Sequence, residues 1–223
     1  MSKEIINTIL LAGSFLFLFG IAEMLYHKLK IKADDTRKIV HIGTGLLTML
    51  FPLMLDNHWF VLLLCASFAL ILLLSLKFNL LPSINAIDRI SYGSLWYPLA
   101  VYGCYLAYNY FHNNLLFFYL PVLTMAICDP VAAFFGKRWS YGKFYISHDA
   151  KTVTGCAAFF LSSLVLTILL FYFFSSGNFR INVLPIALLI AAATTVTEAL
   201  STKGLDNITI PVCVVLILTL VHD

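Results

Sequence analysis

The chain has 223 residues, of which 61% are hydrophobic and only 11% are charged, and its mean hydropathy is +0.93. This composition excludes an ordinary soluble globular protein and indicates an integral membrane protein. The net charge of +3 is modest and the basic residues are spread over short loops, so the sequence also argues against nucleic-acid binding.

Eight apolar stretches are long enough to cross a membrane, since a span needs about 17 to 25 mostly apolar residues. We expect an all-α, polytopic membrane helix bundle that forms one integral membrane domain over residues 1–223. In chain order, the predicted helices cover residues 5–27, 38–55, 58–77, 93–111, 114–136, 152–175, 181–200 and 208–222. Pro98, Pro121 and Pro130 are expected to kink or end helices.

The Lys and Arg residues fall almost entirely on one side of this bundle. All 14 of them except Lys3 and Arg180 lie in the first, third, fifth and seventh loops, with Arg89 in the third. Because positively charged loops remain in the cytoplasm, we expect both termini to be non-cytoplasmic. Most acidic residues, such as Asp88, lie near the same face. The two signs of charge together suit a multivalent anion with its metal ion.

The segment RKIVHIGTG, which starts at Arg37, opens the second predicted helix. Arg37 and His41 lie one turn apart on one helix face, and Lys38 is three residues before His41. Arg37 and Lys38 alone are equally well explained as snorkelling anchors at the membrane surface. His41 lies a turn deeper and favours a functional site. Gly43 and Gly45 are more typical of close helix packing than of a ligand site.

Asp129 stands near the end of the fifth predicted helix. An ionised aspartate inside a bilayer costs ~2.5 kcal/mol or more unless it faces a cavity, a cation or a partner. We therefore favour a functional aspartate over a structural ion pair. Ala132, Ala133 and Gly136 follow at helical spacing, so the helix face beside the carboxylate carries only small residues, along which a nucleotide could lie.

The loop after this helix, GKRWSYGKF, is not a P-loop. That motif needs four residues between its glycines and Ser or Thr after the lysine, whereas five residues separate Gly136 from Gly142 and Phe144 follows Lys143. The loop up to Lys151 still carries four cations, enough to surround phosphates. A charge run of this kind is nevertheless more often a solvated loop.

The segment KTVTG, residues 151–155, is expected to open the sixth helix, where free backbone N–H groups can face an anion. Glu198 ends the seventh predicted helix, and Asp206 and Asn207 precede the eighth. A helix cap is the better explanation for one of the latter two residues. Glu198 has no such structural role and is a candidate functional acid.

In this order the motifs resemble the CTP-dependent lipid-alcohol kinases: phytol and farnesol kinases, dolichol kinase and the yeast-type diacylglycerol kinase. Each motif is weak alone, but four in order on one membrane face are fairly specific, and they extend over residues 37–211. The matching residues are Arg37, Lys38 and His41; Asp129, Ala132 and Gly136; Lys151, Thr152 and Gly155; and Glu198, Asp206, Asn207, Thr209 and Pro211.

The resemblance implies that Arg37, Lys38, Asp129 and Gly136 are needed for activity. The chain departs from the family pattern at two positions. Thr154 stands where the family commonly has an acid, and Pro130 follows the aspartate in place of a small residue. If the missing acid is a metal ligand in the family, two explanations are open for this chain. Asp149 can take the place of that acid, or the chain prefers a different nucleotide from the rest of the family.

The resemblance implies a membrane kinase that transfers the γ-phosphate of CTP to the primary hydroxyl of an isoprenoid alcohol. Mg²⁺, a nucleoside triphosphate and a membrane lipid alcohol are the expected partners, and the active site is expected at the cytoplasmic face of a prokaryotic cytoplasmic membrane. The expected catalytic residues are Asp129, His41 and Glu198. The expected metal ligands are Asp129, Glu198 and Asp206. The expected nucleotide-binding residues are Arg37, Lys38, Gly136, Lys143, Lys151, Thr152, Gly155 and Asn207.

Two other functions are compatible with the sequence. A cytidylyltransferase that forms a CDP-lipid is related to this family, although the long H-G-G and D-R-x-D signature is absent from the sequence. A secondary transporter is less favoured, because the two halves of the chain show no repeat and the charges gather at one face rather than at the midplane.

Overall fold

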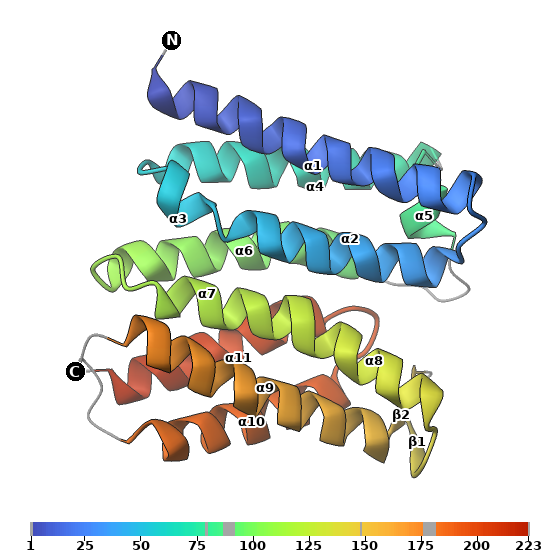
Figure 1. The fold of residues 1–223 in the computed structure, drawn as a ribbon, viewed down its shortest axis with the longest axis vertical. Coiled ribbons are helices and arrows are strands. Elements are labelled where there is room, and N and C mark those ends of the chain that lie inside the picture. The colour runs from blue at the N-terminus through green and yellow to red at the C-terminus, as the bar shows by residue number, and fades with distance from the viewer. Residues whose placement is uncertain (1, 79, 87–91, 148, 176–181, 223) are drawn as a thin grey trace.

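The computed structural model describes residues 2–78, 80–86, 92–147, 149–175 and 182–222. Three of the charged residues used to predict the topology lie outside these described residues: Asp88, Arg89 and Arg180. Residue 181, the expected start of the seventh span, also lies outside them. The described residues form a bundle whose long helices lie side by side (Figure 1).

The first half of the chain contains α1 (Lys3–His27), α2 (Ala33–Thr48), α3 (Phe51–Met54), α4 (His58–Phe78), α5 (Pro82–Asn85) and α6 (Gly93–Tyr110). The second half contains α7 (Leu116–Leu123), the π-helix η1 (Thr124–Cys128), α8 (Asp129–Arg138), the strands β1 (Lys143–Ile146) and β2 (Asp149–Thr152), α9 (Val153–Phe174), α10 (Val183–Leu200) and α11 (Asp206–Val221). Every apolar stretch taken from the sequence is therefore largely helical.

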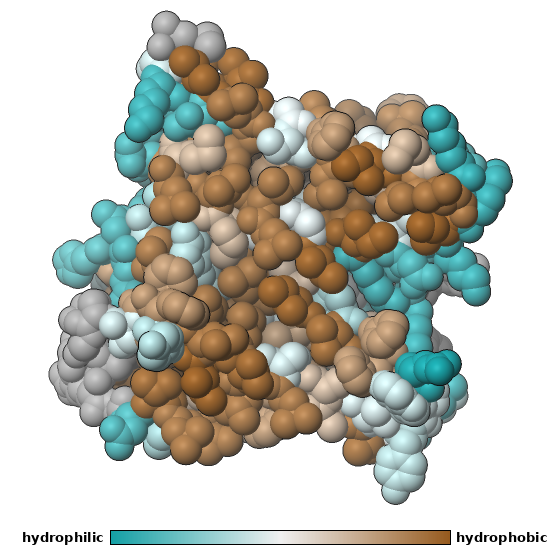
Figure 2. Space-filling model, in the orientation of Figure 1, coloured by the Kyte–Doolittle hydropathy of each residue, from teal (hydrophilic) through white to brown (hydrophobic). Residues whose placement is uncertain are grey.

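The surface confirms that the protein is embedded in a membrane. Figure 2 shows a hydrophobic band across the middle of the helices and hydrophilic residues gathered near their two ends. Within the described ranges, five helical segments are long and apolar enough to cross a membrane: α1, α4, the continuous segment Leu116–Arg138, α9 and α10. The helix α11 is apolar but shorter. The count of eight spans and the placement of the termini stay predictions.

Two predicted helices depart from a regular α-helix. The second, expected over 38–55, starts earlier and ends at Thr48, and the short α3 follows with Pro52 in its first turn. The fifth helix is continuous but changes its winding to a π-helix just before Asp129. Pro130 has no backbone N–H to continue the α-helical ladder, which accounts for a local change in winding at this point. π-Bulges are frequent at functional sites.

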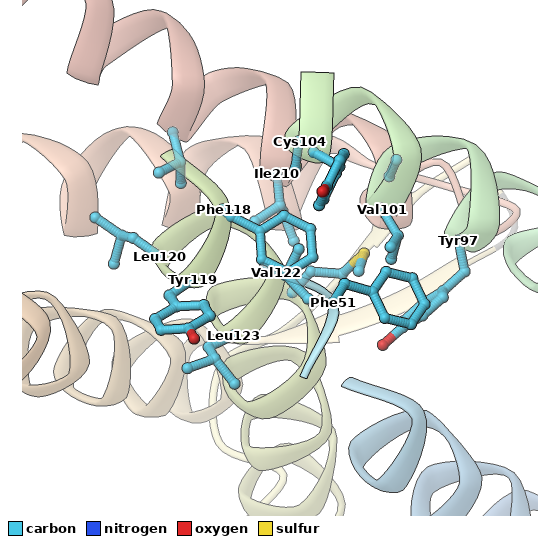
Figure 3. Packing of buried hydrophobic residues seen from close by; sticks show 14 of the residues in the cluster. Phe51, Tyr97, Val101, Cys104, Phe118, Tyr119, Leu120, Val122, Leu123 and Ile210 are labelled. Atoms are coloured by element: carbon cyan, nitrogen blue, oxygen red, sulfur yellow. The ribbon is translucent and has the colours of Figure 1, made fainter. Parts of the chain in front are cut away.

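The segment formed by α7 and η1 is the centre of the bundle. All residues of α7 are buried, and η1 packs against α2, α9 and α11. Figure 3 shows the core around it, where the Phe118 ring lies between Phe51 and the region of Cys104. The ring centroids of Phe118 and Phe51 are 6.4 Å apart. This packing fixes the position of Asp129, which follows η1 directly.

The described residues include a β-hairpin, which the all-α prediction missed. β1 and β2 are antiparallel, with Lys143 opposite Thr152 and Ile146 opposite Asp149. Lys151 and Thr152 therefore belong to a strand, and α9 starts only at Val153. The short strands lie at the end of the bundle where α8 ends and α9 begins (Figure 1).

Candidate functional site

A cluster of charged residues lies at one end of the bundle, where several helices start or end. Asp129 is the first residue of α8 and Asp206 is the first residue of α11. Asp206 interacts electrostatically with Asp129, Lys151 and His41. The fold thus brings together charged residues that are up to 165 positions apart in the sequence, counted from His41 to Asp206.

Lys151 and Glu198 form a buried ion pair in this cluster. The Lys151 Nζ atom lies 2.5 Å from Glu198 Oε1 and donates a second hydrogen bond of 2.9 Å to the Glu198 main-chain oxygen. Only 15% and 6% of the two side chains are exposed. Burial is the largest single influence and opposes the charged lysine, but Glu198, Asp206 and Asp129 together outweigh it and raise the pKa of Lys151 above its usual value. Lys151 is therefore a cation at neutral pH.

His41 is held in one tautomer by the π-helix. Its Nε2 atom lies 3.1 Å from the Met125 main-chain oxygen in η1. A carbonyl oxygen only accepts hydrogen bonds, so Nε2 carries the hydrogen and Nδ1 of the neutral ring keeps its lone pair. The ring packs edge-on against Tyr97, with centroids 4.9 Å apart. His41 is thus oriented as a hydrogen-bond acceptor through Nδ1.

Arg37, Gly93 and Asn207 meet where α2, α6 and α11 begin. Asn207 Nδ2 donates a buried hydrogen bond of 2.9 Å to the Gly93 oxygen. A Cβ atom at Gly93 would lie 2.5 Å from Asn207 Nδ2 and 3.2 Å from a guanidinium nitrogen of Arg37. Only glycine allows this approach. Gly93 does not stand out in the sequence, because a single glycine at a helix start carries no motif.

A cavity of about 80 Å³ extends from this point into the bundle. Its polar end is lined by Arg37, His41, Ser94 and Asn207, and the remainder is mostly apolar and aromatic. The walls come mainly from α1, α2, α4 and α6, with single residues from α3 (Phe51), α5 (Ile84) and α11 (Asn207). The sequence gives no signal for this cavity, because the aromatic residues that line it look like any other apolar residues of membrane helices.

Two of the expected nucleotide-binding lysines have other neighbours. Lys38 Nζ lies 2.8 Å from an Asp34 oxygen and 3.7 Å from Asp35, and Lys137 also binds Asp34. Lys143 is exposed on β1, with its ammonium 5.4 Å from the centre of the Tyr145 ring. Contact of Lys38 and Lys143 with a nucleotide stays a prediction.

Gly136, Thr152 and Gly155 form a tight crossing between α8 and α9. A Cβ atom at Gly136 would lie 2.7 Å from Thr152 Oγ1 and 3.4 Å from Gly155 Cα. The Thr152 hydroxyl caps α9 by accepting a hydrogen bond of 3.0 Å from the Gly155 N–H. This donor, expected to face an anion, is thus occupied. Nucleotide binding by these three residues also stays a prediction.

Neither Asp206 nor Asn207 is the N-cap of α11, which is Leu205. Asp206 Oδ1 instead accepts a hydrogen bond of 3.0 Å from the Asn207 N–H, within the first turn. Asp149, the possible substitute for the missing family acid, accepts a hydrogen bond of 2.9 Å from the Lys203 N–H. It therefore joins the hairpin to the loop before α11.

The three acids expected to bind metal are arranged as one pair and one separate residue. Asp129 and Asp206 interact as like charges, whereas Glu198 is paired with Lys151. In the parts of the chain that the structure describes, no three His, Cys, Asp or Glu side chains are grouped closely enough to hold a metal ion. Mg²⁺ typically needs only one or two carboxylates when phosphates supply further ligands. The pair of Asp129 and Asp206 fits that requirement.

These features define a membrane-embedded protein in which a polar cluster suited to phosphates adjoins an apolar cavity. No protein-family model matches the chain, and no solved structure matches it. The chain is 32% identical over 203 residues to a phytol kinase from Synechocystis sp., covering 90% of this chain and 85% of that protein. It therefore belongs to the CTP-dependent lipid-alcohol kinase family.

Proposed function

We propose that this protein transfers the γ-phosphate of CTP to the primary hydroxyl of an isoprenoid alcohol of the phytol, geranylgeraniol or polyprenol type. The observation that carries the proposal is the junction at Arg37 and His41, which line the polar end of an apolar cavity and belong to the same cluster as Asp129 and Lys151. A reaction between a water-soluble nucleotide and a lipid needs such a junction. The cyanobacterial relative supports a prokaryotic membrane. The gathering of Lys and Arg in alternate loops supports the cytoplasmic side for the site.

The cluster supplies the charges that phosphoryl transfer requires. Such transfer depends mainly on positioning and on neutralising the phosphate oxygens. Arg37 and Lys151 are the cations that we assign to the triphosphate, with Asn207 as a further polar contact. Asp129 and Asp206 are the residues that would hold Mg²⁺, which when bound neutralises phosphate charge. This assignment leaves Glu198 to position Lys151 rather than to bind the metal or act as a base.

We assign His41 as the general base, in preference to Glu198 or Asp206. The hydrogen bond from Nε2 to Met125 leaves Nδ1 as the acceptor of the alcohol proton. As that proton moves to Nδ1, the alcohol oxygen forms a bond to the γ-phosphorus. The bond from this phosphorus to the bridging β–γ oxygen breaks, and CDP leaves with the electron pair. Lys38, Lys143, Gly136, Thr152 and Gly155 remain proposed nucleotide contacts from the family resemblance.

The decisive experiment incubates the purified protein in lipid nanodiscs with γ-labelled CTP, Mg²⁺ and a panel of prenols, dolichol and diacylglycerol. We expect label in a prenol product, and unlabelled product from α-labelled CTP. If all the label stays in CTP with every acceptor, the kinase proposal is wrong. If α-label enters the lipid, the protein is a cytidylyltransferase. Replacing CTP with labelled ATP or GTP in parallel tests the nucleotide preference.

A further inference from the structure

The cavity follows one face of α2 for most of the length of that helix. Arg37, His41, Thr44 and Thr48 all line it, and their spacing of four, three and four residues places them on a single helix face. At 1.5 Å per residue, the eleven steps from Arg37 to Thr48 correspond to about 17 Å along the helix axis. The cavity is therefore elongated and runs from the polar cluster into the apolar part of the bundle.

The lining changes from polar to apolar along this path. The rest of the lining includes Cys65 and Phe68 of α4 and Val101 of α6. The two threonines do not make it polar, because their hydroxyls donate hydrogen bonds within α2. Thr44 Oγ1 donates to the Val40 oxygen at 2.8 Å and Thr48 Oγ1 to the Gly45 oxygen at 2.7 Å. A hydrocarbon chain suits such a lining better than a polar solute does.

The far end of the cavity is closed by packed aromatic rings. Phe15 and Phe51 lie 6.0 Å apart between centroids, and Phe15 and Phe68 lie 4.8 Å apart. Phe51 is 1% exposed and also packs against Phe118 in the core. A ring held on several sides does not move aside at low cost. Thr48 and Phe51 therefore form a rigid wall at the end of the cavity away from Arg37, which we call its floor.

We propose that this cavity holds the part of the acceptor alcohol's hydrocarbon tail nearest the hydroxyl, with the hydroxyl towards His41, and that Thr48 and Phe51 limit how far the tail enters. This inference rests on the proposed function and identifies where the lipid part of the substrate binds. It assigns the tail to the space between α1, α2, α4 and α6 rather than to the outer surface of the bundle.

The experiment measures kcat/KM for prenols of increasing chain length with the wild-type protein, Thr48→Phe and Phe51→Leu. Thr48→Phe fills the floor, so we expect kcat/KM for long prenols to fall about tenfold or more while that for the shortest prenol stays within about threefold. Phe51→Leu opens the floor, so the preferred length should increase. Leu53→Phe is the matched control, since Leu53 is 67% exposed next to the same segment.

Thermal unfolding and gel filtration in detergent identify any variant that fails to fold, and Phe51→Leu decides the question if Thr48→Phe is misfolded. Folded variants with the wild-type length profile, or with equal losses for every prenol, would overturn the tail assignment. Wild-type protein that phosphorylates no prenol would instead overturn the proposed function. A prenol with a photoreactive group at its tail end gives a test without catalysis, with labelling expected on α2, α4 or α3.

Discussion

Lys151 at the end of the hairpin binds both the carboxylate and the main-chain oxygen of Glu198, the third-last residue of α10. The Glu198 oxygen also accepts a hydrogen bond of 3.2 Å from the Ser201 N–H at the C-cap of α10, so the lysine adds a second donor there and complements the helix dipole. The same cation faces the charges of Asp129 and Asp206. This ion pair thus connects the hairpin, the end of α10 and the proposed phosphate site.

Removal of one member of this pair should destabilise the protein. Lys151→Met and Glu198→Leu each leave a buried charge without its partner, which costs about 3–5 kcal/mol. The double variant should recover most of that loss, because it leaves no uncompensated charge. Chemical unfolding in detergent measures the three variants. Activity is the second readout: we expect it to stay low in the double variant, since Lys151 is also proposed to bind phosphate. Recovery of activity with stability would show that the pair is only structural.

Asp129→Asn should lower turnover about 100-fold or more without loss of the fold, because the amide keeps the shape but not the charge needed for Mg²⁺. The Mg²⁺ concentration at half-maximal rate should also rise. Asp35→Asn is the control, since Asp35 lies at the same end of the bundle with 59% of its side chain exposed. Equal Mg²⁺ dependence in wild type and Asp129→Asn would contradict the metal assignment.

His41→Gln separates the two proposed roles of the histidine. The glutamine amide can still donate a hydrogen bond to the Met125 oxygen, but it offers no basic nitrogen at the position of Nδ1. We expect near-native stability and a kcat reduced about 10²- to 10⁴-fold. His41→Ala should lose stability as well, by about 1–3 kcal/mol, because the carbonyl is left without a donor. Wild-type turnover by the glutamine variant would transfer the base role to Asp206 or Glu198.

Arg37 and Lys38 are adjacent in the sequence, but we expect different effects from their replacement. Arg37→Gln should reduce kcat/KM strongly, because Arg37 lines the polar end of the cavity. Lys38→Gln should have a smaller effect, because the Lys38 ammonium is paired with Asp34 and Asp35. Steady-state kinetics with CTP measures both. Equal losses would indicate that Lys38 leaves its carboxylate partners when the nucleotide binds.

The glycines provide a test of packing that is independent of catalysis. A Cβ atom at Gly155 would lie 3.0 Å from Thr152 Oγ1 and 3.2 Å from the Ala132 oxygen, so Gly155→Ala should destabilise the protein by about 1–3 kcal/mol. Gly103→Ala is the control. Its Cβ atom would meet nothing within 4 Å, and alanine favours a helix by about 0.5–1 kcal/mol. Thermal unfolding should therefore shift in opposite directions for the two variants.

Much of the helical framework followed from the sequence, because a membrane-spanning helix satisfies its own backbone hydrogen bonds and needs only a sufficiently long apolar segment. The stretches 58–77 and 93–111 match α4 and α6 to within one residue at each end. The hairpin was missed because its strands have only four residues each and pair with each other within a charged loop, and an alternating pattern that short does not stand out. The break after Thr48 was also missed, although Pro52 was visible in the sequence.

Sequence alone also determined the candidate residues, since Asp129, His41 and Glu198 stand out by the cost of placing polar groups in apolar segments. Only the tertiary structure decided their partners. The pairing of Glu198 with Lys151, the hydrogen bond from His41 to Met125 and the contact of Asn207 with Gly93 join elements far apart in the chain. Such contacts depend on how helices pack against one another, and local composition does not specify that packing. The cavity is the clearest case, because its walls are assembled from several helices that are separate in the sequence.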